Sequence, residues 1–254
     1  MAPTGNLRYR PARRLVQLYL GLVLYGTSMA MMIRSDLGLN PWDVFHQGLS
    51  MITGMSIGAA TIVTGILVLL LWIPLRLRPG LGTVSNVLVI GVVVDLALAL
   101  LPTGMPLAAR IGLLVVGIVG NGLATGLYLG ARFGPGPRDG LMSGYVARRP
   151  GRSIRLVRTV IEVTVLALGW LLGGTVGIGT VAYALAIGPL AQVFIPMFTV
   201  APPAGPDTGT PGGQAAGTSR GGTDPSGTRP HAASAPQPAA PQPAAPQPAA
   251  PPVG

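Results

Sequence analysis

Few residues in this chain could carry out acid–base, nucleophilic or metal chemistry. The sequence contains no cysteine and only two histidines, so thiolate chemistry is excluded and a histidine-rich metal site is not expected. The H-E-x-x-H spacing of zinc proteases and the P-loop of nucleotide-binding proteins do not occur either. We therefore expect no enzymatic activity, no bound cofactor and no metal ion.

Charged side chains within apolar stretches form one group of candidate functional residues. Asp95 and Glu162 lie in segments apolar enough to cross a membrane, where an ionised group is costly and often functional. Arg158 precedes Glu162 by four residues on the same helical face, so these two charges can neutralise each other. Asp95 has no such partner in its own segment, which leaves Arg34, Arg138 or a protonated carboxyl as the alternatives.

A short motif that occurs twice supplies the other candidates. Residues 40–43 and 136–139 both place proline at the first position of an expected helix and aspartate two residues later. Proline lacks the N–H that would be unpaired there, and the carboxylate complements the positive end of the helix. The motif either only begins a helix or also contributes to a substrate pathway. The candidate pathway residues are Asn40, Pro41, Trp42, Asp43, Asp95, Pro137, Arg138, Asp139, Arg158 and Glu162.

The composition indicates that the elements holding these residues lie in a membrane. Of the 254 residues, 49% are hydrophobic and 9% are charged, whereas soluble domains carry about 25% charged residues. The net charge of +10 comes from arginines that mostly flank apolar segments, which is how membrane proteins set their orientation. We therefore expect an all-α integral membrane protein that contacts the lipid bilayer and binds no nucleic acid.

Six apolar segments are long enough to cross the bilayer as helices. They are residues 15–33, 57–75, 83–101, 111–131, 154–172 and 180–200. Two weaker segments, 41–54 and 137–149, would form helices of about 20 Å, too short for a hydrocarbon core of about 30 Å. With six crossings, only Arg34 and Arg110 fall on the far side, so both termini are expected in the cytoplasm of a bacterial inner membrane.

The two halves of this region resemble each other. Residues 37–43 match 133–139 at an offset of 96, and residues 80–83 match 177–180 at an offset of 97. Each half holds three expected spans, an odd number, so the second copy must be inverted relative to the first. Inverted repeats are common in secondary transporters, with functional sites at the repeat interface.

Four parts of the chain follow from this pattern. Residues 1–14 form a basic cytoplasmic lead, and residues 15–101 and 110–200 form the two membrane repeats. Residues 201–254 are rich in proline, alanine and glycine and cannot bury enough apolar surface to fold, so we expect a disordered tail.

The two short segments can be placed in two ways. The extended linkers before them can reach the membrane midplane, so that each segment forms a re-entrant half-helix with its positive N-terminus pointing inward. Alternatively, residues 41–54 lie flat in the interface, because they carry an apolar stripe opposite a polar one. The apolar stripe is Trp42, Phe45, Leu49 and Ile52, and the polar stripe is Asp43, His46, Gln47 and Ser50.

Three blocks of this sequence resemble the YczE/YitT-like family of bacterial multi-pass membrane proteins, most closely its YczE side. The blocks are 37–43, 134–142 and 173–180, and the resemblance covers about residues 15–198. It implies a multi-pass membrane protein and implies no particular substrate.

Two functions are consistent with these observations. The chain could be a small-solute transporter or channel-like protein with its pathway at the repeat interface. It could instead be a membrane accessory protein that regulates another membrane protein without transporting anything. In either case a homo-oligomer is an open alternative.

Overall fold

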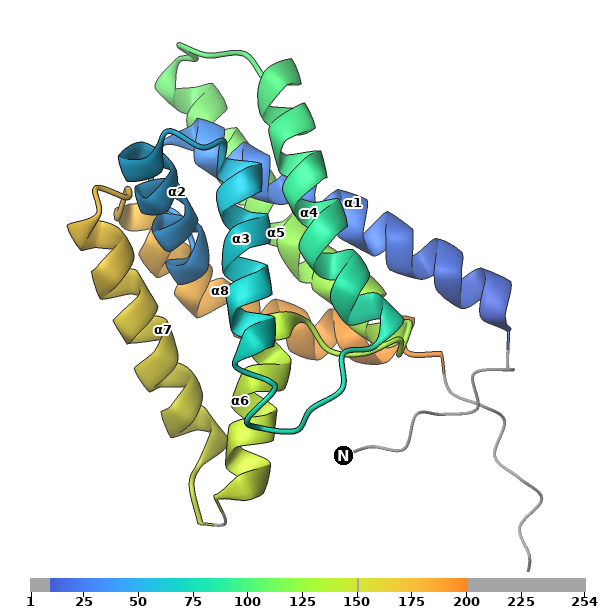
Figure 1. Ribbon diagram of the computed structural model, residues 1–254. Coiled ribbons are helices and arrows are strands. Elements are labelled where there is room, and N and C mark those ends of the chain that lie inside the picture. The colour runs from blue at the N-terminus through green and yellow to red at the C-terminus, as the bar shows by residue number, and fades with distance from the viewer. Residues whose placement is uncertain (1–9, 150, 201–254) are drawn as a thin grey trace, which may run out of the picture. The chain divides into compact units, whose positions relative to one another are not determined.

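The computed structural model describes residues 10–149 and 151–200, and the ordered elements of this part of the chain are all helices. The prediction of an all-α protein is therefore confirmed. The helices are α1 (Pro11–Ser35), α2 (Pro41–Thr53), α3 (Ile57–Leu70), α4 (Leu81–Leu100), α5 (Leu107–Gly130), α6 (Pro137–Arg148), α7 (Ile154–Leu171) and α8 (Ile178–Phe198) (Figure 1). The predicted tail, residues 201–254, and most of the predicted basic lead lie outside the described residues.

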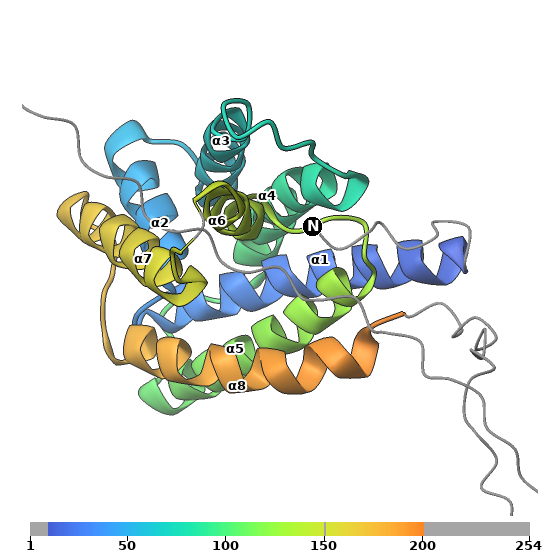
Figure 2. The same cartoon turned by 90° about the horizontal axis from the view of Figure 1, so that it is seen from below.

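The helices form two groups that meet along α1 and α4. The helix α1 packs against α5 and α4, and α8 packs on the other side of α5. The helix α2 lies between α7 and α3, and α6 contacts α3 and α7 (Figure 2). The two short helices α2 and α6 thus both pack against α3 and α7.

Four helices are long and apolar enough to cross a membrane, namely α1, α4, α5 and α8. The helices α2 and α3 make a fifth candidate only if they are taken together as one broken span, since they bend by 112°. The expected spans 57–75 and 154–172 are less regular than the sequence suggested. The helix α3 ends at Leu70 after 14 residues, and α7 carries three charged residues along its 18. Six crossings therefore remain a prediction.

The outer surface of the helices is apolar, as a bilayer requires. Large hydrophobic side chains are exposed on several of them, including Leu100, Leu171, Ile178 and Leu185, each at least 73% exposed. In water such a surface would be costly, because each of these side chains loses about 1.5–3 kcal/mol of transfer free energy by staying exposed. In contact with lipid chains the cost disappears.

An arginine at the start of α1 holds the end of α5. Arg14 is 3% exposed, and its Nε donates to the carbonyl oxygen of Ala131 at 2.9 Å and its Nη2 to that of Arg132 at 3.1 Å. The last carbonyls of a helix have no partner within the helix, so the guanidinium satisfies two of them. The sequence predicted a basic lead over residues 1–14. In the structure α1 already begins at Pro11, and Arg14 is a buried residue of its first turn.

Arg110 makes the same contacts at the end of α1. Its Nε donates to the carbonyl oxygen of Ser35 at 2.7 Å and its Nη2 to that of Asp36 at 2.8 Å. Arg110 lies 96 positions after Arg14 in the sequence, and its two acceptors lie 96 positions before the two acceptors of Arg14. Since each arginine begins one helix and reaches the end of the other, α1 and α5 run antiparallel.

The linkers before α2 and α6 are also held in matching ways. The N–H of Gly179, in the first turn of α8, donates to the carbonyl oxygen of Leu37 at 2.7 Å. The N–H of Gly82, in the first turn of α4, donates to that of Phe133 at 3.0 Å. Each linker therefore bonds to the start of a helix in the other half of the chain. The first linker bonds to α8 and the second to α4.

Glycine is required in both linkers. Gly38 has a φ of +116° and Gly134 a φ of +125°, a region that side chains rarely allow. A Cβ atom at Gly38 would lie 2.7 Å from the backbone N of Gly177, and one at Gly134 would lie 2.8 Å from Oγ1 of Thr83. Any larger residue would push the linker away from the helix start that holds it.

We predict that Arg14→Met lowers the thermal stability of the purified protein, by about 2 kcal/mol or more. The variant leaves two carbonyl oxygens at the end of α5 without their charged donor, and a hydrogen bond to a charged group is worth about 1.5–3 kcal/mol. Arg13→Met is the matched control, because Arg13 is the neighbouring exposed residue of the same helix. Equal melting temperatures for the two variants in detergent would contradict the assignment.

Candidate functional site

A cavity of about 70 Å³ is bordered by the first turns of both α2 and α6. This volume admits several water molecules or a small solute. Its polar lining consists of Tyr25, Asp43, His46, Thr61, Thr64, Asn86, Tyr128, Arg138 and Asp139, with the indole of Trp42 beside them. Buried polar and charged groups in a membrane protein typically face a pathway or a binding site.

The side of the cavity formed by α2 is organised by Asn40. Its side-chain oxygen accepts hydrogen bonds from the backbone N–H groups of Trp42 and Asp43, both at 3.1 Å. Its amide nitrogen donates to Oδ2 of Asp43. Asn40 thus caps the helix and also orients the carboxylate of Asp43, which is 3% exposed. Nδ1 of His46 lies 3.6 Å from the other oxygen of Asp43, an ion-pair distance when the imidazole is protonated.

The side formed by α6 presents a cation and a carboxylate. Nη2 of Arg138 donates to the hydroxyl oxygen of Tyr25 at 2.6 Å, and the hydroxyl of Tyr128 donates to Oδ2 of Asp139 at 2.9 Å. The residue before this helix, Gly136, has no side chain to cap it. Among the described residues, no carboxylate oxygen lies within 4 Å of the Arg138 guanidinium.

Three buried polar atoms at the cavity have no hydrogen-bond partner within the described part of the chain. They are Nε1 of Trp42, Nδ1 of His46 and Oγ1 of Thr64. Leaving a buried polar group unpaired costs about 1–3 kcal/mol, so native proteins rarely keep several together without water or a ligand. The three atoms therefore point to something that occupies the cavity.

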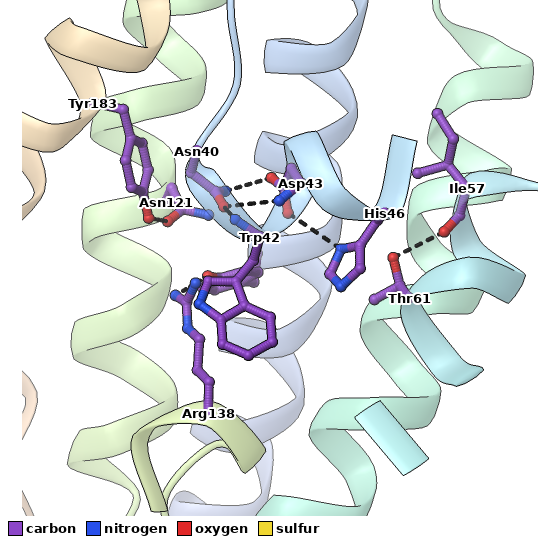
Figure 3. A network of polar contacts seen from close by, with 10 residues as sticks. Asn40, Trp42, Asp43, His46, Ile57, Thr61, Asn121, Arg138 and Tyr183 are labelled. Carbon is purple, nitrogen blue, oxygen red and sulfur yellow. Dashed lines mark hydrogen bonds and ion pairs between the residues drawn. The ribbon is translucent and has the colours of Figure 1, made fainter. Parts of the chain in front are cut away.

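A hydrogen-bonded chain supports the cavity wall from behind. The hydroxyl of Tyr183 on α8 donates to Oδ1 of Asn121 on α5 at 2.9 Å (Figure 3). Nδ2 of Asn121 in turn donates to Oγ of Ser28 on α1 at 3.2 Å. All three residues are at most 5% exposed. Hydrogen bonds of this kind hold membrane helices together at a fixed distance.

The structure brings together most of the residues that the sequence singled out. Trp42, Asp43, Pro137, Arg138 and Asp139 all line the cavity, and Asn40 orients Asp43. Pro41 begins α2 as predicted. The six-crossing prediction placed Arg138 on the cytoplasmic side with most other arginines. In the structure its side chain lines the cavity.

The other three candidates lie elsewhere. Asp95 accepts hydrogen bonds from Oγ of Ser56 at 2.5 Å and from the N–H of Gly58 at 2.8 Å, so it holds the start of α3. Neither arginine proposed as its partner reaches it. Arg158 and Glu162 form the expected ion pair at 3.0 Å on a face of α7 away from the cavity.

Ser56 stands in a sequence that resembles a catalytic motif. Residues 54–58 have the G-x-S-x-G spacing of a hydrolase nucleophile elbow. That motif requires a strand before the serine and a histidine beside it. Here the serine follows the helix α2, its side chain caps α3 by accepting from the N–H of Ala59, and its hydroxyl donates to Asp95.

Sequence reasoning missed the aromatic and hydroxyl residues that complete the cavity. Tyr25, Tyr128 and Thr64 lie inside apolar segments, where their types are common and carry no distinctive spacing. A polar residue recurring on the inward face of each helix was the only available signal.

The burial of α2 argues against the interfacial placement. Asp43 and His46 are 3% and 7% exposed, whereas Ile52 on the proposed apolar stripe is 63% exposed. A helix lying flat on the membrane would turn its polar residues to water. In this protein they face the interior instead.

Comparison with known proteins identifies the family. The family described as "Family of unknown function (DUF6198)" matches residues 12–196 of the chain, which include the starts of the seven helices after α1 and all the residues that line the cavity. The chain belongs to this family. The resemblance to YczE inferred from the sequence blocks is confirmed.

Three relatives align with about 70% of the chain. An uncharacterized protein of Haemophilus influenzae is 39% identical over 178 residues, 81% of its own length. The uncharacterized membrane protein YczE of Bacillus subtilis is 31% identical over 180 residues, 83% of its length. The uncharacterized protein YyaS of the same organism is 28% identical over 182 residues, 90% of its length. No solved structure matches the chain. Together with its apolar helices, these relatives identify this DUF6198 chain as a multi-pass membrane protein.

We predict that Asp95→Ala lowers the thermal stability of this DUF6198 protein by about 1–2 kcal/mol, because the first turn of α3 loses an acceptor that serves two donors. Asp95→Asn keeps one acceptor oxygen and should lose less. The measurement is the melting temperature of each purified variant in the same detergent. If Asp95→Ala proves as stable as the native protein, the carboxylate has another role.

Proposed function

We propose that this protein moves a small solute across the membrane through the cavity between α2 and α6. The observation that carries the proposal is the set of unpartnered polar atoms and charged groups enclosed where two short helices begin. In a bilayer, helix breaks with unpaired backbone are tolerated only where protein buries them or where they line a watery cavity. Transporters use such breaks to build their binding sites near the midplane.

We further propose that the two halves form inverted repeats with six crossings in total. Two pairs of contacts and one pair of backbone angles support this arrangement. Arg14 and Arg110 cap each other's helices, the two linkers bond to the starts of α4 and α8, and the positive φ angles of Gly38 and Gly134 correspond. Each pair is related by an offset of 96 or 97 residues. The antiparallel course of α1 and α5 is what an in-plane two-fold axis would produce.

The distribution of arginines supports a bacterial inner membrane with both termini in the cytoplasm. Arg14 and Arg132 lie together at one end of α1 and α5, and Arg34 and Arg110 at the other. Nη1 of Arg148, at the end of α6, donates to the carbonyl oxygen of Pro74, which follows α3. The α3 segment and α6 thus reach the same side, as two segments that end in the cytoplasm would.

The two halves differ in one respect that suits a transporter. Gly91 of α4 packs directly against α3, because a Cβ atom on it would lie 2.5 Å from Ile62. Its counterpart Gly188 of α8 has open space in the corresponding direction. Likewise Val87 is buried, whereas its counterpart Ala184 is exposed. We propose that α7 and α8 close in the other half of a transport cycle while α3 and α4 separate.

Cysteine pairs can test this exchange, because the native chain has no cysteine. Gly65→Cys with Val87→Cys should cross-link in the conformation described here, since Gly65 lies against Val87. Glu162→Cys with Ala184→Cys, the pair at an offset of 97, should cross-link in the opposite conformation. Glu162→Cys with Leu185→Cys is the control. We expect both matched pairs to react in membranes, each in a fraction of the molecules. Cross-linking of the first pair alone under all conditions would count against an alternating transporter.

Water access to the cavity gives a second test. A small membrane-impermeant thiosulfonate should react with Thr64→Cys, because the side chain at this position lines the cavity. The neighbouring Val63→Cys faces outward and serves as the control at equal depth, since a thiol in lipid is neither ionised nor reached by the reagent. Failure of both positions to react from either side would favour the alternative, a membrane accessory protein that transports nothing.

A further inference from the structure

We infer that the cavity binds a small oxyanion, either a short carboxylate or an inorganic anion of similar size, between Arg138 of α6 and Trp42 of α2. This inference rests on the proposed function, because it names the chemical class of the solute that occupies the same cavity. It is carried by the mismatch between donors and acceptors in the lining.

The unpartnered groups are mainly donors. Nε1–H of Trp42 can only donate, and the hydroxyl of Thr64 can donate as well as accept. Both side chains are buried, at 7% and 4% exposed, and both line the cavity. An occupant that satisfies them must therefore present acceptor atoms.

Arg138 is the charged group in the cavity that most needs a partner. Its guanidinium carries several donors, of which one bonds to the neutral hydroxyl of Tyr25, and no described carboxylate lies within 4 Å of it. Its side chain extends from α6 toward the first turn of α2, where the indole of Trp42 also projects (Figure 3). Planar oxyanions match the fork of a guanidinium with two parallel hydrogen bonds.

The two carboxylates of the cavity have hydrogen-bond partners of their own. Asp43 accepts from Asn40 and faces His46, and Asp139 accepts from Tyr128. Each also lies in the first turn of its own helix, where the partial positive charge stabilises it. Neither lies within 4 Å of the Arg138 guanidinium, so donors of this group are left for an incoming solute.

The size of the cavity limits the anion. A volume of about 70 Å³ accommodates acetate or nitrate, whereas a chain of six hydroxylated carbons such as gluconate would extend beyond it. Acetate and nitrate share a planar group of oxygens, and they stand for the organic and inorganic sources of the same chemistry. Gluconate can then serve as a carboxylate control that is too large.

The test is the melting temperature of the purified full-length protein in detergent. Sodium acetate and sodium nitrate are titrated against sodium gluconate at constant ionic strength, because a ligand that binds the folded state raises its stability. We expect at least one of the two small anions to raise the melting temperature in a saturable way, and the more effective one identifies the organic or the inorganic source. Gluconate alone should have no such effect.

Variants assign the effect to the cavity. Arg138→Gln should weaken the apparent affinity by about 10- to 100-fold, the equivalent of one hydrogen bond to a charged group. Trp42→Phe should weaken it less, because a neutral donor is lost. Arg148→Gln removes an arginine of the same helix that bonds outside the cavity, and it should bind as the native protein does. A small-anion effect that persists in Arg138→Gln would overturn the proposed site.

Other solutes provide the opposing outcomes. If methylammonium gluconate or glycine stabilises the protein and neither small anion does, the cavity accepts a cation or a zwitterion and the inference is wrong. Stabilisation by no solute also overturns it. These results are distinguishable from a failure of the proposed function, because the reaction of Thr64→Cys with the aqueous reagent reports a watery pathway whatever the solute is.

Discussion

Every backbone N–H and C=O group inside a bilayer must find a partner within the protein, and this constraint organises the whole structure. The chain breaks its helices between α1 and α2 and between α5 and α6. Each break exposes carbonyl groups at one helix end and a linker with no partners of its own. Arg14, Arg110, Gly82 and Gly179 supply those partners from distant parts of the chain. These contacts fix where α2 and α6 begin.

The same breaks create the chemistry of the cavity. A continuous helix would hide its backbone dipoles, whereas α2 and α6 direct two positive helix ends at one space. Their first turns also carry the charged residues Asp43, Arg138 and Asp139. These buried groups need polar partners in place of water. The protein compensates each carboxylate with a neighbouring donor, Asn40 or Tyr128. The guanidinium of Arg138 bonds to the neutral hydroxyl of Tyr25, and no carboxylate oxygen of the described residues lies within 4 Å of it.

Close packing of small residues fixes the scaffold around this space. Gly122, Gly126 and Gly130 of α5 lie directly against Leu190, Phe194 and Phe198 of α8, so that a Cβ atom on any of them would approach within 2.7 Å. This dense contact contrasts with the open space beside Gly188 of α8. The layer formed by α1, α5 and α8 is thus closely packed, whereas the face of α8 at Gly188 has no close neighbour among the described residues.

Much of the fold could be predicted because its causes are local. The starts of α2 and α6 at Pro41 and Pro137 follow from a capping position, a proline and an aspartate within four residues, and their ends lie within a residue of the predicted ones. The membrane class follows from hydropathy, and the internal correspondence from the offset of 96 to 97 residues. The exact extent of α3 was missed, because the turns after Leu70 are as apolar as the helix before them.

The sequence by itself determined the helical class, the two half-helix starts and the residues they bring to the site. The tertiary structure alone decided which polar groups pair and which are left without a partner. Arg14 bonds to residues more than 100 positions away, Asp95 holds the start of α3, and Tyr25 and Tyr128 reach α6 from other helices. A helix cap depends on three or four neighbouring residues, so it can be recognised in the local sequence. A partner across the bundle depends on which helix faces are brought together, and only packing determines that.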